Sequence, residues 1–400
     1  MDKLMLGDVM QKLYYDSPYI KDFVGKIVDI REIDGELHIA LEQSCFYPGG
    51  GGQPADTGYF DTADVTDCYQ DGGLIYHVLQ SPSSKYSLSE KINGKINFDR
   101  RFAFMQNHTG EHILSGLAKS QFGATNVGFH MSECGFTMDL NIPLPKHQVQ
   151  QLQDEANKVV FSAKTVEILN ICGKDMSNAD ARAKRDFSED DFARIVTIPS
   201  VDKCACAGLH VANTAEVGII KIANYEKYKG GIRLHVYCGQ DALWDYSRKN
   251  AIIKNIGSMI SADIDGIVPA LEKRISLNEA LKKHCTTLQN EIFELKTANI
   301  PNKVLAYAIE NRMDSKDAQR LAKMASVQAK MAVVFVSDND TYKYVAHSEN
   351  SEFLTIFFEK LNNAFEGKGS CKNGMAQGIV KAAVLDIITF LEVLGETYRI

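Results

Sequence analysis

The sequence predicts an α+β protein built from several domains, and three observations lead to that class. At 400 residues the chain is too long for a single hydrophobic core. Its first part follows the two-residue alternation of β-strands, whereas residues 99–122 and 241–298 follow the three- and four-residue spacing of helices. We therefore expect four parts: a small barrel-like β domain (1–92), an α+β domain with a metal site (93–240), a helical connector (241–301) and an α/β domain (302–400).

The N-terminal β domain is expected to contain a hairpin and a glycine run. GKIVDIREIDGELHIALEQ alternates apolar and polar residues around Asp34-Gly35, a dipeptide typical of hairpin turns. The glycine run that follows consists of Gly49, Gly50, Gly51 and Gly52. The run lacks the Gly-Lys-Ser/Thr ending of a P-loop, which argues against nucleotide phosphate binding. Glycines let the backbone approach a ligand closely, so the run is either a ligand loop of fixed shape or a flexible loop.

Two pairs of residues with the same spacing point to a metal site. His108 and His112 are four residues apart on the first long helix, so both imidazoles can reach one ion. Histidines on an apolar helix face are more often core residues, but Cys206 and His210 repeat the spacing far downstream. Mixed nitrogen and sulfur ligands favour zinc. Cys204 competes with Cys206 as the thiolate, and the repeated spacing favours Cys206.

The connector and the C-terminal domain offer two further candidate surfaces. In the connector, apolar residues recur at heptad spacing, at Leu281, Cys285, Leu288, Ile292 and Leu295. The seam covers little more than two heptads, so it fits an intramolecular helical hairpin as well as a homodimer through residues 241–400. In the C-terminal domain, EGKGSCKNGMAQG (366–378) is expected to be a glycine-rich loop that opens a helix from Ile379 to Leu394. The first turn of that helix could meet an anion or simply follow a tight connection.

Charge and cysteine content narrow the function classes. The formal net charge of −7 excludes a chain-wide basic field for nucleic acid. Residues 273–330 nevertheless carry eleven Lys/Arg against six Asp/Glu, which indicates a phosphate-binding patch or a solvated helical face. No apolar run approaches about 18 residues, so we expect no membrane span, and the start lacks a signal-peptide pattern. The nine scattered cysteines favour a reducing cytoplasm.

Four motifs occur in an order and at a spacing that together form a signature. They are FYPGGGGQPADTG (46–58), DRRFAFMQNHTGEH (99–112), CAGLHVANTAEVG (206–218) and KGGIRLHVYCG (229–239). With them the chain resembles the long form of the AlaX family, free-standing relatives of the editing domain of alanyl-tRNA synthetase. The tail resembles the DHH-associated domain that ends the synthetase, through GKGSCKNGMAQG (367–378), so the resemblance covers essentially the whole chain. The aminoacylation core is missing, which implies no ATP binding and no ligase activity.

The resemblance implies hydrolysis of the ester between a wrong amino acid, chiefly serine and in some members glycine, and alanine tRNA. It assigns the zinc ligands to His108, His112, Cys206 and His210. It places the glycine loop, Gly49 to Gln53, in the amino-acid pocket, and assigns recognition of the serine side chain to Ser44. The family has threonine there, so Ser44 keeps the hydroxyl and loses the methyl group. Binding of tRNA by the tail would involve Gly367, Lys368, Gly369, Lys372 and Gln377.

The sequence leaves the catalytic base unassigned and two other functions open. Glu111 precedes His112, but successive helical residues point about 100° apart, so we expect Glu111 to cap or brace. Four protein ligands favour an orienting or structural zinc unless the coordination changes. HTGEH also fits the His-x-x-Glu-His string of inverzincin peptidases, which leaves Cys206 and His210 unexplained. The other alternative is a non-catalytic tRNA-binding module with structural zinc.

Overall fold

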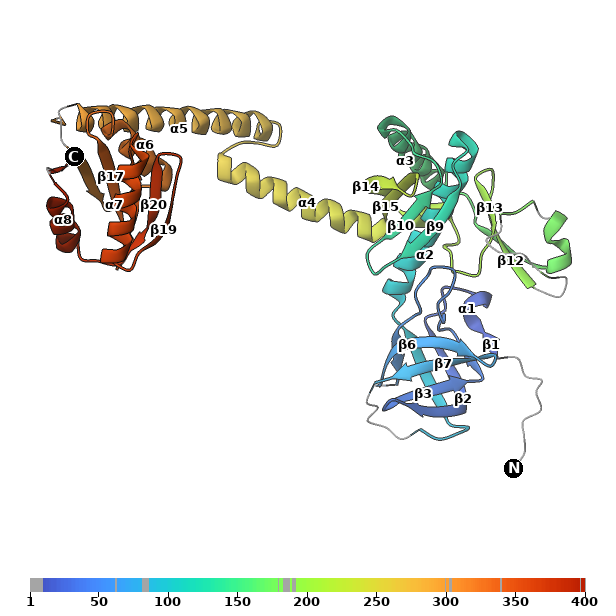
Figure 1. Ribbon diagram of the computed structural model, residues 1–400. Coiled ribbons are helices and arrows are strands. Elements are labelled where there is room, and N and C mark those ends of the chain that lie inside the picture. Colours follow the sequence, from blue (N-terminus) through green and yellow to red (C-terminus); the bar gives the residue numbers. More distant parts are fainter. Residues whose placement is uncertain are drawn as a thin grey trace. The chain divides into compact units, whose positions relative to one another are not determined.

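The structure is a computed structural model of the chain (Figure 1). It describes residues 10–61, 63–80, 86–178, 180–182, 188, 192–298, 300–301, 304–338, 340–395 and 397–399. The chain divides into two compact units, the first ending at Asn255 and the second beginning at Ile256. The predicted α+β multidomain class is confirmed, whereas the four domain boundaries stay a prediction. Among the residues described, no helix combines the length and apolarity needed to cross a membrane.

Six strands of the first unit close into a barrel (Figure 1). In barrel order they are β2 (Asp22–Ile33), β3 (Glu36–Leu41), β7 (Leu74–Leu79), β6 (Ala63–Asp71), β5 (Gly58–Phe60) and β8 (Lys91–Ile96). Asp34 and Gly35, with φ of 55° and 83°, form the turn between β2 and β3. Before the barrel lie β1 (Gln11–Lys12) and α1 (Leu13–Asp16). Strand β1 pairs with β4 (Gln43–Ser44), which places Lys12 opposite Ser44.

The helix α2 (Phe98–Phe122) organises the remainder of the first unit. It begins at Asn97, whose side chain accepts the Arg100 N–H at 3.3 Å, and ends at the left-handed Gly123. It packs against α3 (Lys146–Phe161). A Cβ at Gly116 would lie 2.2 Å from the Val201 carbonyl oxygen, so glycine is needed for this close approach. The turn before Asp202 therefore lies directly against the helix.

Two sheets of the first unit flank the helix. One is four-stranded, with β9 (Asn126–Met131), β10 (Phe136–Leu140), β14 (Ile220–Tyr228) and β15 (Gly231–Cys238). The other is three-stranded, with β11 (Glu167–Cys172), β12 (Phe192–Ile198) and β13 (Asp202–Ala205). Short 3₁₀ turns, η1 (Gly173–Asn178) and η2 (Thr214–Val217), lie between strands. Strand β13 leads directly into the segment that carries Cys206 and His210.

A buried ion pair joins α2 to the barrel. Arg101 is 0% exposed and Asp56 1% exposed. The Arg101 Nε donates to Asp56 Oδ2 at 3.0 Å, and its Nη2 contacts the same carboxylate and the Cys45 carbonyl. Its Nη1 donates to the Pro18 carbonyl at 3.2 Å. Asp56 Oδ2 also accepts the Tyr47 N–H at 2.6 Å, so the glycine loop is anchored at both ends to one helix side chain.

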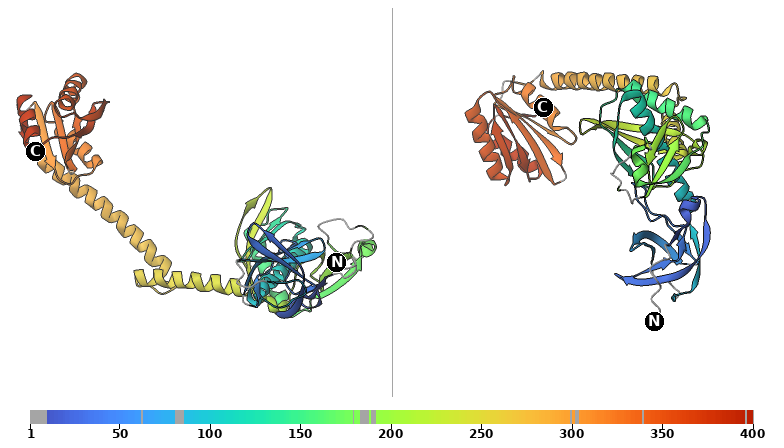
Figure 2. Two further views of the ribbon diagram at one scale, coloured as in Figure 1. Left: turned by 90° about the horizontal axis from the view of Figure 1, so that it is seen from below. Right: turned by 90° about the vertical axis from the view of Figure 1, so that its right-hand side faces the viewer.

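The second unit is a sheet covered by helices on both faces (Figures 1 and 2). The strands, in sheet order, are β19 (Lys368–Lys372), β20 (Met375–Val380), β18 (Thr341–His347), β17 (Met331–Asp338), β16 (Leu305–Glu310) and β21 (Thr397–Arg399). Val333 and Phe335 of β17 pack with α7 (Ser351–Ala364) and α8 (Val384–Val393). Val334 and Val336 pack with α6 (Ser315–Ala325) and with Phe293 of α5 (Ile267–Thr297). The alternation of side chains along one strand explains the two faces.

The prediction that residues 366–378 form a glycine-rich loop leading into a helix at Ile379 is wrong. Strands β19 and β20 occupy most of it as an antiparallel hairpin, and α8 begins only at Val384. The turn is Asn373-Gly374, with φ of 53° and 73°, a pair that favours hairpins. Four of the residues predicted to contact tRNA therefore lie on these strands, and Gly367 directly precedes them. None of them opens a helix.

The predicted helical connector consists of two helices. α4 (Gly239–Ile260) ends before Ser261, which has a φ of 57°, and α5 begins at Ile267. Asp263 Oδ1 accepts the Gly266 N–H at 2.8 Å, a local bond that competes with helix continuation. The apolar seam lies on α5, and its aliphatic members are exposed, at 52% for Leu281, 44% for Leu288, 51% for Ile292 and 76% for Leu295.

We predict that Arg101→Met lowers the free energy of unfolding by about 3–5 kcal/mol, because Asp56 would keep a buried, uncompensated charge. Urea denaturation followed by circular dichroism measures the loss. Adding Asp56→Asn should restore part of it. The control is Lys158→Met on α3, which is 70% exposed and pairs with Glu155 one turn away, and the expected cost there is below about 1 kcal/mol. Equal losses for the two variants would contradict the anchoring role.

Candidate metal centre

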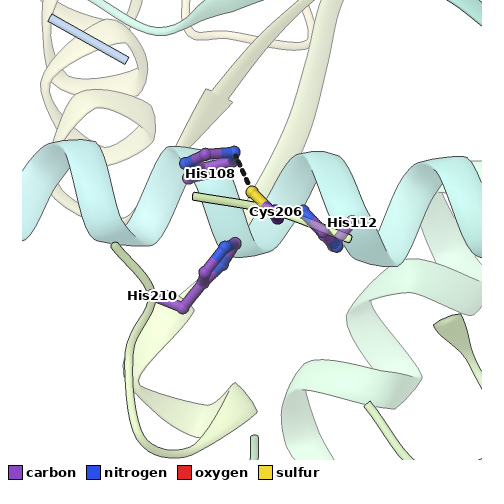
Figure 3. Close-up of side chains that lie close together, drawn as sticks. All are labelled: His108, His112, Cys206 and His210. Atoms are coloured by element: carbon purple, nitrogen blue, oxygen red, sulfur yellow. Dashed lines mark hydrogen bonds between the residues drawn. The ribbon is translucent and has the colours of Figure 1, made fainter. Parts of the chain in front are cut away.

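The four residues predicted as metal ligands come together in the first unit (Figure 3). His108 and His112 extend from α2, and Cys206 and His210 come from the segment after β13. One ligand atom of each residue lies within 4.8 Å of the others. Cys206 Sγ is 3.4 Å from His108 Nε2, and the His210 ring centroid is 4.5 Å and 4.6 Å from those of His108 and His112. The helical spacing thus places both imidazoles at one point.

Each histidine is oriented through its Nδ1 atom. His108 Nδ1 lies 3.0 Å from Gln53 Oε1, which also accepts the Leu209 N–H at 2.9 Å. His112 Nδ1 lies 2.9 Å from Asp202 Oδ2. Because both of these oxygens accept, the two imidazoles donate from Nδ1 and keep the Nε2 lone pair free. His210 Nδ1 lies 3.2 Å from Thr109 Oγ1. Such outer contacts are the usual means of orienting histidine ligands.

The donor set fits a metal ion. His210 is 1% exposed, and its Nε2 has no hydrogen-bond partner among the residues described. A buried nitrogen of this kind is costly unless something outside the protein chain satisfies it. Three imidazole nitrogens and one sulfur are a common tetrahedral ligand set. His108, His112, Cys206 and His210 could therefore hold one ion.

The electrostatics of the cluster favour the metal-binding form of the thiol. Burial alone would raise the pKa of Cys206, but the electrostatic effect of His108 and of the other two histidines holds that pKa well below its usual value. Thiolate is the form that binds metals. Burial also opposes charge on Asp202, yet contacts from His112 and Arg182 lower the pKa of its carboxyl to about 2. Asp202 is therefore ionised at neutral pH and accepts from His112.

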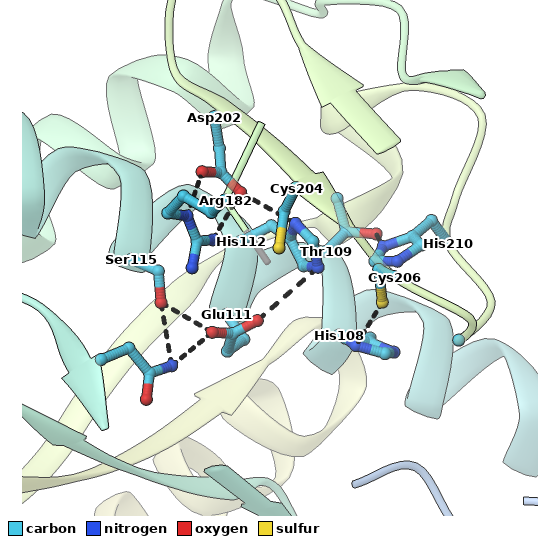
Figure 4. Close-up of polar contacts among 12 residues, drawn as sticks. His108, Thr109, Glu111, His112, Ser115, Arg182, Asp202, Cys204, Cys206 and His210 are labelled. Atoms are coloured by element: carbon cyan, nitrogen blue, oxygen red, sulfur yellow. Dashed lines mark hydrogen bonds and ion pairs between the residues drawn. The ribbon is translucent and has the colours of Figure 1, made fainter. Parts of the chain in front are cut away.

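Asp202 belongs to a chain of polar contacts that ends at the cluster (Figure 4). Arg182 Nε and Nη2 donate to its two carboxylate oxygens at 2.7 and 2.6 Å, a bidentate pair that fixes the carboxylate. Cys204 lies within 4.8 Å of ligand atoms of His112 and Asp202, but it is not part of the four-residue group. The structure thus groups Cys206, and not Cys204, with His108, His112 and His210.

Glu111 braces its own helix through Ser115, as expected, but its carboxylate also lies closer to the site than the helical angle alone indicates. Its Oε2 lies 3.7 Å from His112 Nε2, and the residue lines the adjacent cavity. Oε1 accepts from Ser115 Oγ at 2.6 Å and from Asn126 Nδ2, so the carboxylate is held in place (Figure 4). The helical angle fixes the direction of Cβ only, and two methylene groups carry the carboxylate back toward the cluster.

A cavity of about 700 Å³ opens beside the cluster, within the size range of ligand pockets. Among the residues that line it are Lys12, Tyr15, Gly51, His108, Glu111, His112, Arg182, Arg194 and Cys206. The cavity therefore combines three of the four candidate metal ligands with one carboxylate and three cationic side chains.

The glycine loop reaches this site through Gly51 and Gln53. Gly50 and Gln53 exchange two backbone hydrogen bonds of 3.0 Å, which close the loop tightly. Gly51 lines the cavity, and the Gln53 side chain contacts His108. A Cβ at Gly208 would lie 2.0 Å from His108 Cε1, so glycine is needed where the second ligand segment crosses that ring.

Ser44 is not among the residues that line the cavity. It is 0% exposed, and its Oγ lies 2.8 Å from His77 Nε2 and accepts the Phe46 N–H at 3.0 Å. Burial lowers the pKa of His77 to about 4, so the ring is neutral at pH 7. With His77 Nδ1 donating to the Ile39 carbonyl at 2.9 Å, Nε2 accepts from the Ser44 hydroxyl. The donor capacity of that hydroxyl is therefore used within the barrel.

Sequence reasoning missed the residues that support the cluster. Asp202, Thr109 and Arg182 contact ligands or each other only because distant segments meet. Thr109 lies beside His108 in the same motif, and Asp202 is four residues before Cys206. Closeness in sequence to a predicted ligand was therefore the signal that could have identified both residues. Nothing local in the sequence marks Lys12 or Arg194 as cavity residues.

The chain is similar to tRNA-related proteins. A family model described as "Threonyl and Alanyl tRNA synthetase second additional domain" matches residues 193–235. "Alanyl-tRNA editing protein AlaX-L" of Pyrococcus horikoshii is 28% identical over 396 residues, covering 94% of this chain and 95% of that protein. An alanine–tRNA ligase of Saccharolobus islandicus is 27% identical over 377 residues, covering 88% of this chain but 40% of the ligase. The C-Ala domain of Aquifex aeolicus alanyl-tRNA synthetase gives a TM-score of 0.21 at 18% identity over 24% of this chain and 91% of that domain, too low to establish a shared fold.

We predict that Ser44→Ala lowers the free energy of unfolding by about 1–3 kcal/mol, because His77 Nε2 and the Phe46 N–H lose a buried partner. Urea denaturation at pH 7 measures the loss. Ser44→Thr, which keeps the hydroxyl, is the control and should lose less. An alanine variant of unchanged stability that loses hydrolysis of seryl-tRNA but not of glycyl-tRNA would contradict this and return Ser44 to substrate recognition.

Proposed function

We propose that this chain, whose resemblance to the AlaX family is confirmed, deacylates alanine tRNA that carries serine or glycine. The observation that carries the proposal is the convergence of four ligand-type side chains beside a cavity of about 700 Å³. The nearly full-length similarity to an alanyl-tRNA editing protein supports it. Because the chain spans 40% of the matched ligase, we do not extend the ligase activity to it.

The ion we propose is Zn²⁺, held by His108, His112, Cys206 and His210. Imidazole and thiolate together are a ligand set that zinc favours over calcium or magnesium. When bound, zinc would supply a positive charge that polarises the ester or lowers the pKa of a bound water. Gln53, Asp202 and Thr109 orient the three imidazoles, and four protein ligands favour an orienting role for the ion.

The side chains of the cavity can orient both a water and the ester. Hydrolysis of an aminoacyl ester needs a placed water and donors for the developing oxyanion. Glu111 Oε1 is held by Ser115 and Asn126, which leaves Oε2 to accept a hydrogen bond from water. Gly51 brings main-chain N–H groups of the loop to the cavity without a side chain in the way. The hydroxyl group of an esterified serine can form a hydrogen bond in the cavity that alanine cannot form. Such a bond would be the basis of selectivity for serine over alanine.

Two finer partner assignments also belong to this proposal. The hairpin β19–β20 carries Lys368 and Lys372, both able to contact tRNA phosphates. No helix begins at this hairpin, so the positive charge of the two lysines is the support for this assignment. The exposed aliphatic seam of α5 supports a homodimer of the chain.

We predict one zinc ion per chain in the wild type and loss of at least about tenfold in zinc affinity for Cys206→Ala, because one of four ligands is gone. Competition with a chromophoric chelator measures the affinity, and circular dichroism checks the fold. The matched control is Cys204→Ala, which should keep the metal. Full retention in Cys206→Ala together with loss in Cys204→Ala would overturn the ligand set.

The decisive experiment measures release of serine from seryl-tRNA of alanine specificity by purified, zinc-loaded protein. We expect faster hydrolysis of seryl- and glycyl-tRNA than of correct alanyl-tRNA, and strong loss of the activity in His210→Asn. Tight tRNA binding without hydrolysis would favour the non-catalytic module. Cleavage of unstructured peptides without deacylation would favour the peptidase.

A further inference from the structure

We propose that Lys12 and Arg194 form a phosphate subsite in the cavity beside the metal cluster. The subsite would receive the phosphodiester group attached to the terminal nucleotide of the aminoacyl-tRNA. This inference rests on the proposed function, since it names the part of that substrate which Lys12 and Arg194 would bind. It depends on cationic side chains that the protein itself does not neutralise.

Lys12 lines the cavity from β1 without a carboxylate partner among the residues described. Its Nζ donates to Gln70 Oε1 at 3.1 Å, a neutral acceptor. Burial lowers the pKa of this ammonium group, and no carboxylate contact offsets the effect. The side chain is half-exposed and lines the cavity, so its ammonium group stays accessible to a ligand there.

Arg194 lines the same cavity from β12 and is fixed in place. Its Nη1 donates to the carbonyls of Cys206 and Gly208 at 3.1 and 2.6 Å. The guanidinium lies 5.3 Å from the centroid of the Tyr15 ring, and the Tyr15 hydroxyl donates to the Ala207 carbonyl at 3.0 Å. These contacts hold the cation rigidly, yet within the described part of the chain it has no carboxylate partner. Burial lowers the pKa of Arg194 as well.

Three other buried or partly buried arginines of the first unit each have a carboxylate partner. Arg101 pairs with Asp56, Arg182 with Asp202, and Arg233 with Asp139. A buried cation without an anion is costly, so it normally neutralises or finds a partner. Cys206 attracts Arg194 electrostatically, but it does not account for Lys12. Neither Lys12 nor Arg194 has a carboxylate partner among the residues described, so both cations can contact an external anion in the cavity.

The chemistry of the cavity identifies that anion as a phosphate. The lining combines metal ligands and Glu111, where we place the reacting ester, with the two cations and Tyr15. The carboxyl group of an amino acid esterified to tRNA is no longer charged, so the amino acid cannot supply the anion. The remaining anion of the substrate near its ester is the phosphate of the nucleotide chain. Lysine and arginine contacts to phosphate position nucleic acids without reading sequence.

The test compares ligands that differ only in a phosphate, using the full-length, zinc-loaded protein. Calorimetry with 5′-AMP, adenosine and inorganic phosphate should show that AMP binds at least about tenfold more tightly than adenosine, since a charge-assisted contact is worth this much. The advantage should vanish in Lys12→Gln and persist in Lys12→Arg. The control is Lys91→Gln, an exposed lysine on β8 outside the cavity. Equal binding of AMP and adenosine by the wild type, or an AMP advantage that persists in Lys12→Gln, would overturn the subsite.

A kinetic measurement separates failure of the subsite from failure of the proposed function. In Lys12→Gln we expect KM for seryl-tRNA to rise about tenfold with kcat nearly unchanged, because the lost contact positions substrate and does no chemistry. Hydrolysis with an unaltered KM in this variant would overturn the subsite while the function stands. A wild type that hydrolyses no aminoacyl-tRNA but binds AMP in a Lys12-dependent way would support the subsite and overturn the function.

Discussion

The arrangement of the site depends on the contact between Arg101 and Asp56. Arg101 lies on α2, seven residues before His108, and Asp56 follows Gln53 by three residues in the glycine loop. Fixing one pair of side chains therefore fixes the offset between helix and loop. At that offset Gln53 Oε1 meets His108 Nδ1, and Gly51 reaches the cavity. A charged pair buried at both partners leaves little freedom for other offsets, because each alternative would strand a charge.

Residues around the cluster hold its three histidines in their orientations. Gln53, Asp202 and Thr109 come from three different segments, and each engages the Nδ1 of one histidine. Arg182 in turn fixes Asp202, and Arg194 holds the main chain around Cys206. These contacts orient the side chains that would touch an ion. Preorganisation of this kind reduces the reorganisation that binding would otherwise require.

Sequence reasoning succeeded where the governing interaction is local. The i, i+4 spacing of His108 and His112 follows from helical geometry, and so does their common direction. It did not show how close the Glu111 carboxylate lies to the site, because the helical angle does not include the reach of a flexible side chain. The predicted loop at 366–378 was wrong because Asn373-Gly374 is a hairpin dipeptide, and the glycines on either side of it resemble those of a loop. The partners of the histidines, and the place of Ser44 inside the barrel, depend on tertiary contacts that no local pattern encodes.

The two ligand pairs are separated by a long stretch of chain, 98 residues between His108 and Cys206. An ion bound by both pairs would act as a cross-link that closes this stretch into a loop. The entropy of the unfolded chain falls when such a loop is closed, so metal binding would appear as added folding stability. The ion would also bind fully only after the barrel, α2 and β13 had assembled. The metal content of a sample would then measure the fraction of molecules that have folded, as well as the fraction able to catalyse a reaction.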